Sequence, residues 1–215
     1  MSIDQAQQQV FRGCLADSST ILNLVLSDIQ LDKLVSYLVL LNKWNKTYNL
    51  TAVRDPEAML YRHLVDSLSI VQFISGTRVL DVGTGPGLPG IPLAIMYPDK
   101  QFVLLDSNIK KTRFLTQSVI ELGLTNVEVR HGRVEEQVFK QAFDHIVSRA
   151  FAALDKMVEL SHMHLAKNGQ FLAMKGIDPV NEQEALGEQY EIKKTISLDV
   201  PGCEAQRHLI IIEAS

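Results

Sequence analysis

The sequence has few cysteines, no long apolar run and no leader-like start. Its 215 residues include two cysteines, Cys14 and Cys203. Two are too few for a disulfide framework, which favours a reducing compartment. No run of about 18 apolar residues occurs, so we expect no transmembrane helix. The polar residues 1–9 lack the basic and then apolar pattern of a secretory signal. We therefore predict a cytoplasmic protein that does not bind membranes.

Positive charge is also scarce. The chain carries 21 lysines and arginines against 25 acidic residues, a net charge of −4. A protein that binds nucleic acid through a broad basic face usually carries a positive balance. Any contact with nucleic acid must therefore use a local basic patch or the surface of a partner, and composition alone does not identify a substrate.

The first third of the chain has a helical pattern. Apolar residues recur at three- and four-residue steps from Leu31 to Trp44, which predicts one helix with a buried stripe that includes Trp44. A second helix should begin at Pro56, because Asp55 before it is a capping residue and proline is tolerated in a first helical turn. We assign residues 1–75 to an N-terminal helical extension.

From residue 76 onward, short apolar runs alternate with helical stretches. This alternation indicates a parallel sheet covered on both faces. The last two runs are joined by a short turn with no room for a crossover helix, so they should pair antiparallel at one edge. The expected strands are 77–82, 101–106, 126–131, 144–148, 170–174, 190–198 and 208–213, with helices at 109–122 and 154–165. Residues 76–215 thus predict a seven-stranded, mostly parallel, Rossmann-like α/β domain.

A glycine-rich turn follows the first expected strand. Asp81 ends this strand, and Gly83, Gly85 and Gly87 follow at alternate positions. This spacing fits the D-x-G-x-G-x-G motif of Rossmann-like class I methyltransferases, which bind S-adenosylmethionine. Open α/β sheets bind ligands at the carboxyl ends of their strands. Asp106 ends the second strand, where an acid binds the ribose hydroxyls of either a methyl donor or a dinucleotide.

The same turn fits a second motif. Residues 85–90 match G-x-G-x-x-G, the dinucleotide fingerprint, so an NAD-dependent oxidoreductase or another Rossmann-fold nucleotide-binding protein is the alternative. Pro89 and Pro92 in the next helical turn remove N–H groups that a pyrophosphate prefers. With Asp81 ahead of the glycines and the antiparallel edge pair, they favour S-adenosylmethionine.

Three usual means of activating a methyl acceptor are missing. Residues 148–151 occupy the place of the Asn/Asp-Pro-Pro-Tyr element used in amine methylation. Cys14 and Cys203 lie outside the predicted strand ends, where a nucleophile would attack a pyrimidine carbon. His162 and His164 are two residues apart and point in different directions on a helix, so we expect no metal. An acceptor such as guanine N7 needs no activation; a hydroxyl with an unrecognised base also fits.

Several blocks of residues occur in one characteristic order. They are residues 43–51, 62–67, 81–92, 133–136, 148–151, 175–176 and 207–209. This order closely resembles the ribosomal RNA small subunit methyltransferase G family, also called glucose-inhibited division protein B. The resemblance implies methyl transfer from S-adenosylmethionine to N7 of a guanine in 16S ribosomal RNA, with free RNA, an assembly intermediate or the small subunit as partner. No obligate protein partner is evident. Loss of the activity in the family is linked to low-level streptomycin resistance.

The resemblance also implies roles around the methyl donor. Gly83 and Leu88 should line its methionine and ribose side, and Asp106 should bind the ribose hydroxyls. Val134 and Glu135 should flank the adenine. An alternative in which Asp106 only caps the following helix stays open.

Four basic residues are expected to position the substrate. Arg133, Arg149, Lys175 and Arg207 follow or precede predicted strands, and strand ends of a parallel sheet converge. We expect one anion-binding pocket that holds RNA phosphate or guanine O6, with Arg149 also reaching the methyl donor, and no general base. Scattered surface salt bridges are the alternative. Lys111 is expected on a solvated helix face.

Overall fold

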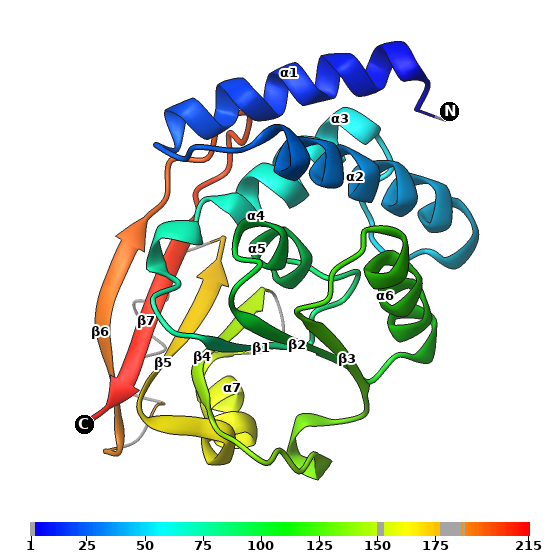
Figure 1. The fold of residues 1–215 in the computed structure, drawn as a ribbon. Helices are drawn as coiled ribbons and strands as arrows, with labels where there is room; N and C mark the ends of the chain where they lie inside the picture. Colours follow the sequence, from blue (N-terminus) through cyan, green and yellow to red (C-terminus); the bar gives the residue numbers. More distant parts are fainter. Residues whose placement is uncertain (1–2, 150–152, 177–185, 187) are drawn as a thin grey trace.

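The computed structural model describes residues 3–149, 153–176, 186 and 188–215, and its centre is one seven-stranded sheet (Figure 1). The strand order is β3-β2-β1-β4-β5-β7-β6. The bounds are β1 Arg78–Val82, β2 Gln101–Asp106, β3 Val127–His131, β4 Phe143–Arg149, β5 Leu165–Lys175, β6 Tyr190–Ser197 and β7 His208–Ala214. The first five strands pair in parallel, whereas β7 pairs antiparallel with both β5 and β6. The predicted parallel sheet with an antiparallel edge pair is confirmed.

Helices cover both faces of the sheet. On one face, α2 (Asp28–Tyr48), α5 (Gly90–Met96) and α6 (Ile109–Glu121) pack on strand residues such as Val79 and Leu104. On the other face, α7 (Leu154–Ser161) packs on residues such as Leu80 and Phe171. Successive strand residues point to opposite faces, and β1 and β2 are buried on both, which explains their continuous apolar runs at residues 79–80 and 102–105.

The helical extension begins with α1 (Gln5–Ile21) and continues through α2. The expected stripe of α2 is buried, and Trp44 packs on Phe114 of α6 with ring centroids 5.6 Å apart. Helix α1 was not predicted as an element of its own, because its only buried apolar side chains are Phe11 and Leu15. The apolar core is continuous from α1 and α2 into the sheet. The predicted boundary between the helical extension and the α/β domain, at residue 75, stays a prediction.

The second predicted helix is divided. It begins at Pro56, and the Asp55 carboxylate accepts the Ala58 N–H at 2.7 Å. It then passes from α3 (Pro56–Met59) through a π-helical stretch, η1 (Leu60–Val65), into α4 (Asp66–Leu68). A short 3₁₀ turn, η2 (Val71–Phe73), leads to the first strand. A single π-helical turn inside an α-helix, such as η1, is frequently found at a functional site.

Another boundary differs from the prediction. The helix expected at 154–165 ends at Ser161 and is followed by a 3₁₀ turn, η4 (His162–His164), after which β5 begins. The start of β5 pairs with Phe143 across a register irregularity in β4, which adds a segment that the apolar pattern of 170–174 does not include. Among the described residues, no helix is long and apolar enough to cross a membrane.

Candidate active site

The glycine-rich turn joins β1 to α5 and is held against the end of β2. Gly83, Gly85 and Gly87 have φ angles of 64°, 63° and 99°, a region that side chains disfavour and glycine adopts freely. The Thr84 N–H donates to the Leu105 carbonyl at 3.1 Å. The predicted turn is therefore present, and its glycines are needed for its backbone path.

Asp81 lies beneath this turn and is fully buried. Its Oδ2 accepts the Thr84 hydroxyl at 2.6 Å and the Gly90 N–H at 2.8 Å. Burial raises the pKa of Asp81 to about 7, opposed in part by these two hydrogen bonds. The side chain lines neither of the cavities described below. The structure thus places Asp81 as a support of the turn, and its contact with a ligand stays a prediction.

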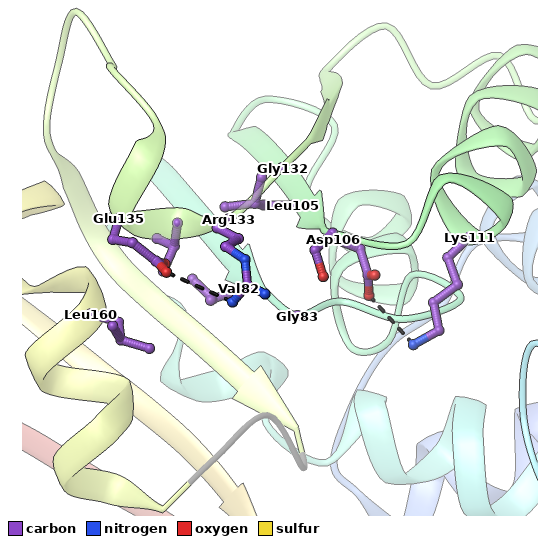
Figure 2. Close-up of a pocket in the computed structure, with 11 residues that line it drawn as sticks. Val82, Gly83, Leu105, Asp106, Lys111, Gly132, Arg133, Glu135 and Leu160 are labelled. Carbon is purple, nitrogen blue, oxygen red and sulfur yellow. Dashed lines mark ion pairs between the residues drawn. The ribbon is translucent and has the colours of Figure 1, made fainter.

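The first cavity lies at the carboxyl ends of β1, β2 and β3 and has a volume of about 270 Å³. Figure 2 shows Asp106 and Lys111 on one side of it and Arg133 with Glu135 on the other. Both predicted adenine-flanking residues, Val134 and Glu135, line it, and Val134 belongs to the 3₁₀ turn η3 (Val134–Glu136). The lining residues are Val82, Gly83, Leu105, Asp106, Ser107, Lys111, Gly132, Arg133, Val134, Glu135 and Leu160.

Asp106, at the end of β2, is hydrogen-bonded both to the glycine-rich turn and to the loop before α6. Its Oδ2 accepts the Gly85 N–H at 2.8 Å, and its Oδ1 accepts the Asn108 N–H at 2.8 Å. Asn108 is itself the cap of α6, because its side chain accepts the Lys110 N–H. The alternative in which Asp106 caps that helix is therefore wrong. The expectation that Lys111 lies on a solvated helix face is also wrong. Its Nζ lies 3.6 Å from Asp106 Oδ2, and this carboxylate draws the side chain inward.

The second cavity opens on the other side of the turn and has a volume of about 510 Å³. Gly83 and Lys111 line both cavities, so the two are adjacent. The second one is lined by Val53, Arg62, His63, Asp66, Gly83, Thr84, Gly85, Pro86, Leu88, Lys111, Arg149, Met174, Lys175, Gly176 and Arg207. The predicted residues Gly85 and Leu88 face this space, whereas Gly87 packs against Ile91 and Leu115.

The four predicted basic residues do not share one cavity. Arg149, Lys175 and Arg207 line the second cavity, and Arg133 lines the first. The strand order explains this correction, because β3 lies on one side of β1 while β4, β5 and β7 lie on the other. The expectation of a single basic pocket is wrong for Arg133. The end of the block 148–151, at residues 150 and 151, lies outside the described residues.

One buried carboxylate joins two of these arginines. Asp66 is 2% exposed, and its two oxygens accept Arg149 Nη1 at 2.9 Å and Arg207 Nε at 3.0 Å. Arg149 Nη1 also donates to the Arg62 carbonyl at 2.8 Å. These arginines are therefore fixed by ion pairs to a buried carboxylate, a partner that the sequence did not predict.

His63 lies beside this group in the second cavity. Its Nδ1 lies 3.0 Å from the Arg62 carbonyl and must donate to it, so Nε2 accepts the Thr51 hydroxyl at 2.8 Å. Burial and the nearby charge of Arg149 lower the pKa of His63 to about 4. The imidazole is thus neutral around pH 7, with both nitrogens occupied.

The lowered pKa of His63 predicts a loss of stability in acid. In the unfolded chain a histidine binds a proton below about pH 6.5, so the contribution is complete above that pH and is lost as pH falls toward 4. We expect a decrease of about 2 kcal/mol in the free energy of unfolding between about pH 7 and about pH 5. Urea titrations should show that His63→Gln lacks this component. His131→Gln, at an exposed position, should retain it.

The helical extension contacts the glycine-rich turn through Tyr37 of α2. This side chain is fully buried, and its hydroxyl donates to the Pro86 carbonyl at 2.7 Å. Tyr37→Phe would leave that carbonyl without its partner, at a cost of about 1–3 kcal/mol in the free energy of unfolding. Denaturant titration should detect the loss. Tyr48→Phe, which changes a side chain 42% exposed, should be near wild type.

The sequence offered partial signals for the residues that were missed. Arg62, His63 and Asp66 fall in one of the characteristic blocks, yet no pattern showed their partners. Tyr37 belongs to the same helical face as the apolar stripe of α2 and therefore resembled an ordinary core residue.

Known proteins resemble this chain over most of its length. The family model of GidB, described as rRNA small subunit methyltransferase G, matches residues 30–210. The methyltransferase of that name from Marinobacter nauticus is 54% identical over 200 residues, 93% of this chain and 94% of that protein. Its counterpart from Ectopseudomonas mendocina is 52% identical over 196 residues, 90% and 92% of the two chains.

Solved structures share the fold at low identity. A SAM-dependent methyltransferase from Aquifex aeolicus superposes with a TM-score of 0.57 at 18% identity, over 76% of this chain and 96% of that one. The fold is thus that of Rossmann-like methyltransferases, and the sequence matches are far closer than this likeness. The chain belongs to the rRNA small subunit methyltransferase G family.

Proposed function

We propose that this protein transfers a methyl group from S-adenosylmethionine to N7 of a guanine in 16S ribosomal RNA of the small ribosomal subunit. The observation that carries the proposal is the pair of adjacent cavities that meet at Gly83. The first offers the carboxylates of Asp106 and Glu135 with apolar walls, and the second is lined by more basic side chains. Membership of the family supports the same reaction.

The residues of the first cavity fit the nucleoside part of the methyl donor. Asp106 has lone pairs beyond those used by the Gly85 and Asn108 N–H groups, and a carboxylate accepts from ribose hydroxyls. Val134 and Leu160 offer apolar contact for the adenine, with Glu135 at its edge. Gly83 lets the donor approach the backbone at the junction. When bound, the donor supplies a methyl group on a cationic sulfur.

The second cavity fits an acceptor that needs no general base. Asp66 is occupied by two arginines, and neutral His63 accepts from Thr51. Guanine N7 carries a free lone pair and no proton, so its methylation depends on alignment with the methyl carbon. Holding two reactants in line can lower a barrier by roughly 7–11 kcal/mol. Arg149, Lys175 and Arg207 would position the base and its phosphates.

Arg133 has a separate role in this proposal. It lies 4.0 Å from Glu135 at the mouth of the first cavity, with a largely exposed side chain. It would contact the donor or an RNA phosphate near the donor.

The helical extension of residues 1–75 would support the domain of residues 76–215 from one side. The reaction would take place in the cytoplasm.

A labelling experiment tests the proposal. Purified protein is incubated with methyl-labelled S-adenosylmethionine and either 16S RNA or small subunits from a strain without this modification. We expect the label in 7-methylguanine; label in another nucleoside would contradict the acceptor. Calorimetry should show binding of S-adenosylmethionine and none of NAD, and the reverse result would support the oxidoreductase alternative.

A further inference from the structure

The second cavity is lined by more cationic than anionic side chains. Its cationic side chains are Arg62, Lys111, Arg149, Lys175 and Arg207. Among the described residues that line it, Asp66 is the only carboxylate. Asp66 is 2% exposed. A carboxylate buried this deeply is costly unless it is paired, and Asp66 is paired with both Arg149 and Arg207.

The proposed reaction, on which this inference rests, moves charge into that cavity. N7 uses its lone pair to form a bond to the methyl carbon while the carbon–sulfur bond breaks. The sulfur keeps the electrons of that bond and becomes neutral, and the purine becomes a cation; no proton is lost. A positive charge that develops near Arg149 and Arg207, whose side chains are 18% and 21% exposed, is opposed by these two guanidinium groups.

We propose that Asp66 is the counter-charge for the methylated base. Its carboxylate offsets one of the two positive charges of Arg149 and Arg207, so that the cavity accepts a purine that becomes cationic during transfer. It also fixes both guanidinium groups, since each donates to a different oxygen. Asp66 starts α4, Arg149 ends β4 and Arg207 precedes β7. It acts through the two arginines and is therefore a positioning residue.

Asp66→Asn separates this role from a purely structural one. The variant keeps the shape of the side chain and makes the cavity more positive. We expect kcat to fall by about tenfold or more, while KM for RNA stays the same or decreases, because added positive charge favours an anionic polymer. Thermal unfolding and calorimetry with S-adenosylmethionine monitor the fold and the first cavity.

Asp32→Asn is the matched control. Asp32 accepts Arg12 Nε at 2.9 Å in an exposed pair on the helical extension, so its loss should leave kcat at the wild-type value. A kcat of Asp66→Asn within about twofold of wild type, or a rise in KM that accompanies the fall in kcat, would overturn the inference alone. An inactive wild type would contradict the proposed function and the inference together.

A binding measurement tests the same role without turnover. With S-adenosylhomocysteine present and at mildly acidic pH, 7-methylguanosine monophosphate carries a cationic base and guanosine monophosphate a neutral one. The affinity for the cationic nucleotide relative to the neutral one should be several-fold higher in the wild-type protein than in Asp66→Asn. The same ratio in both proteins would overturn the role of Asp66.

Discussion

Replacing Asp106 with alanine is expected to weaken binding of S-adenosylmethionine by about 100-fold. The carboxylate would contact the ribose, and it also accepts the Gly85 and Asn108 N–H groups at 2.8 Å. Hydrogen bonds to a charged group are worth about 1.5–3 kcal/mol, and about 2.8 kcal/mol corresponds to 100-fold in affinity. Losing the ribose contact and loosening the turn together account for this effect. Isothermal titration calorimetry measures it.

Asp99 provides a control because it is an aspartate near the same strand, β2, but far from the first cavity. It is exposed and lies just before β2, at the end of that strand opposite Asp106. Asp99→Ala should bind the donor as wild type does. If Asp106→Ala binds within about threefold of wild type, Asp106 does not contact the ribose and the assignment of the first cavity to the donor fails.

Gly90→Ala should destabilise the protein and disrupt the turn. A Cβ at this position would lie 2.2 Å from Leu104 Cδ2 and 2.7 Å from Asp81 Oδ2. Both neighbours are fully buried, so they have little room to move. Overpacking of this kind costs about 1–3 kcal/mol, and we expect the upper value, with a decrease in Tm of roughly 6–12 °C. Calorimetry of thermal unfolding measures this change.

Gly13→Ala supplies the opposite result. Gly13 lies within α1, and nothing is found within 4 Å of the Cβ that alanine would add. Alanine in a helix interior is favoured over glycine by about 1 kcal/mol, so Tm should rise slightly. A Gly90→Ala protein with the Tm of wild type would mean that the core behind the turn is looser than its contacts indicate.

Much of the fold was predictable because its signals are local. Strands buried on both faces have apolar sequences, and Gly83 to Gly87 encode the turn directly through their need for positive φ. The antiparallel edge pair followed from the short connection before residue 208. The π-helical stretch from Leu60 to Val65 had no such signal, since its apolar spacing matches an ordinary helix.

The site was predictable only in part, because its contacts join distant segments. Asp106 could be placed from its position at the end of a strand. Asp66 meets partners 83 and 141 residues away, and no spacing along the chain reveals such pairs. Lys111 belongs to a helix face that is otherwise solvated, and the neighbouring carboxylate of Asp106 draws it inward.

The reversed direction of β7 determines when the second cavity is completed during synthesis. A parallel strand brings its last residues to the ligand-binding edge of the sheet, whereas β7 brings its first, which is why Arg207 lies beside Asp66. Among the described residues, the last one that lines the first cavity is Leu160. A nascent chain therefore contains every described lining residue of the first cavity well before those of the second, and only the final strand fixes Arg207 beside Asp66.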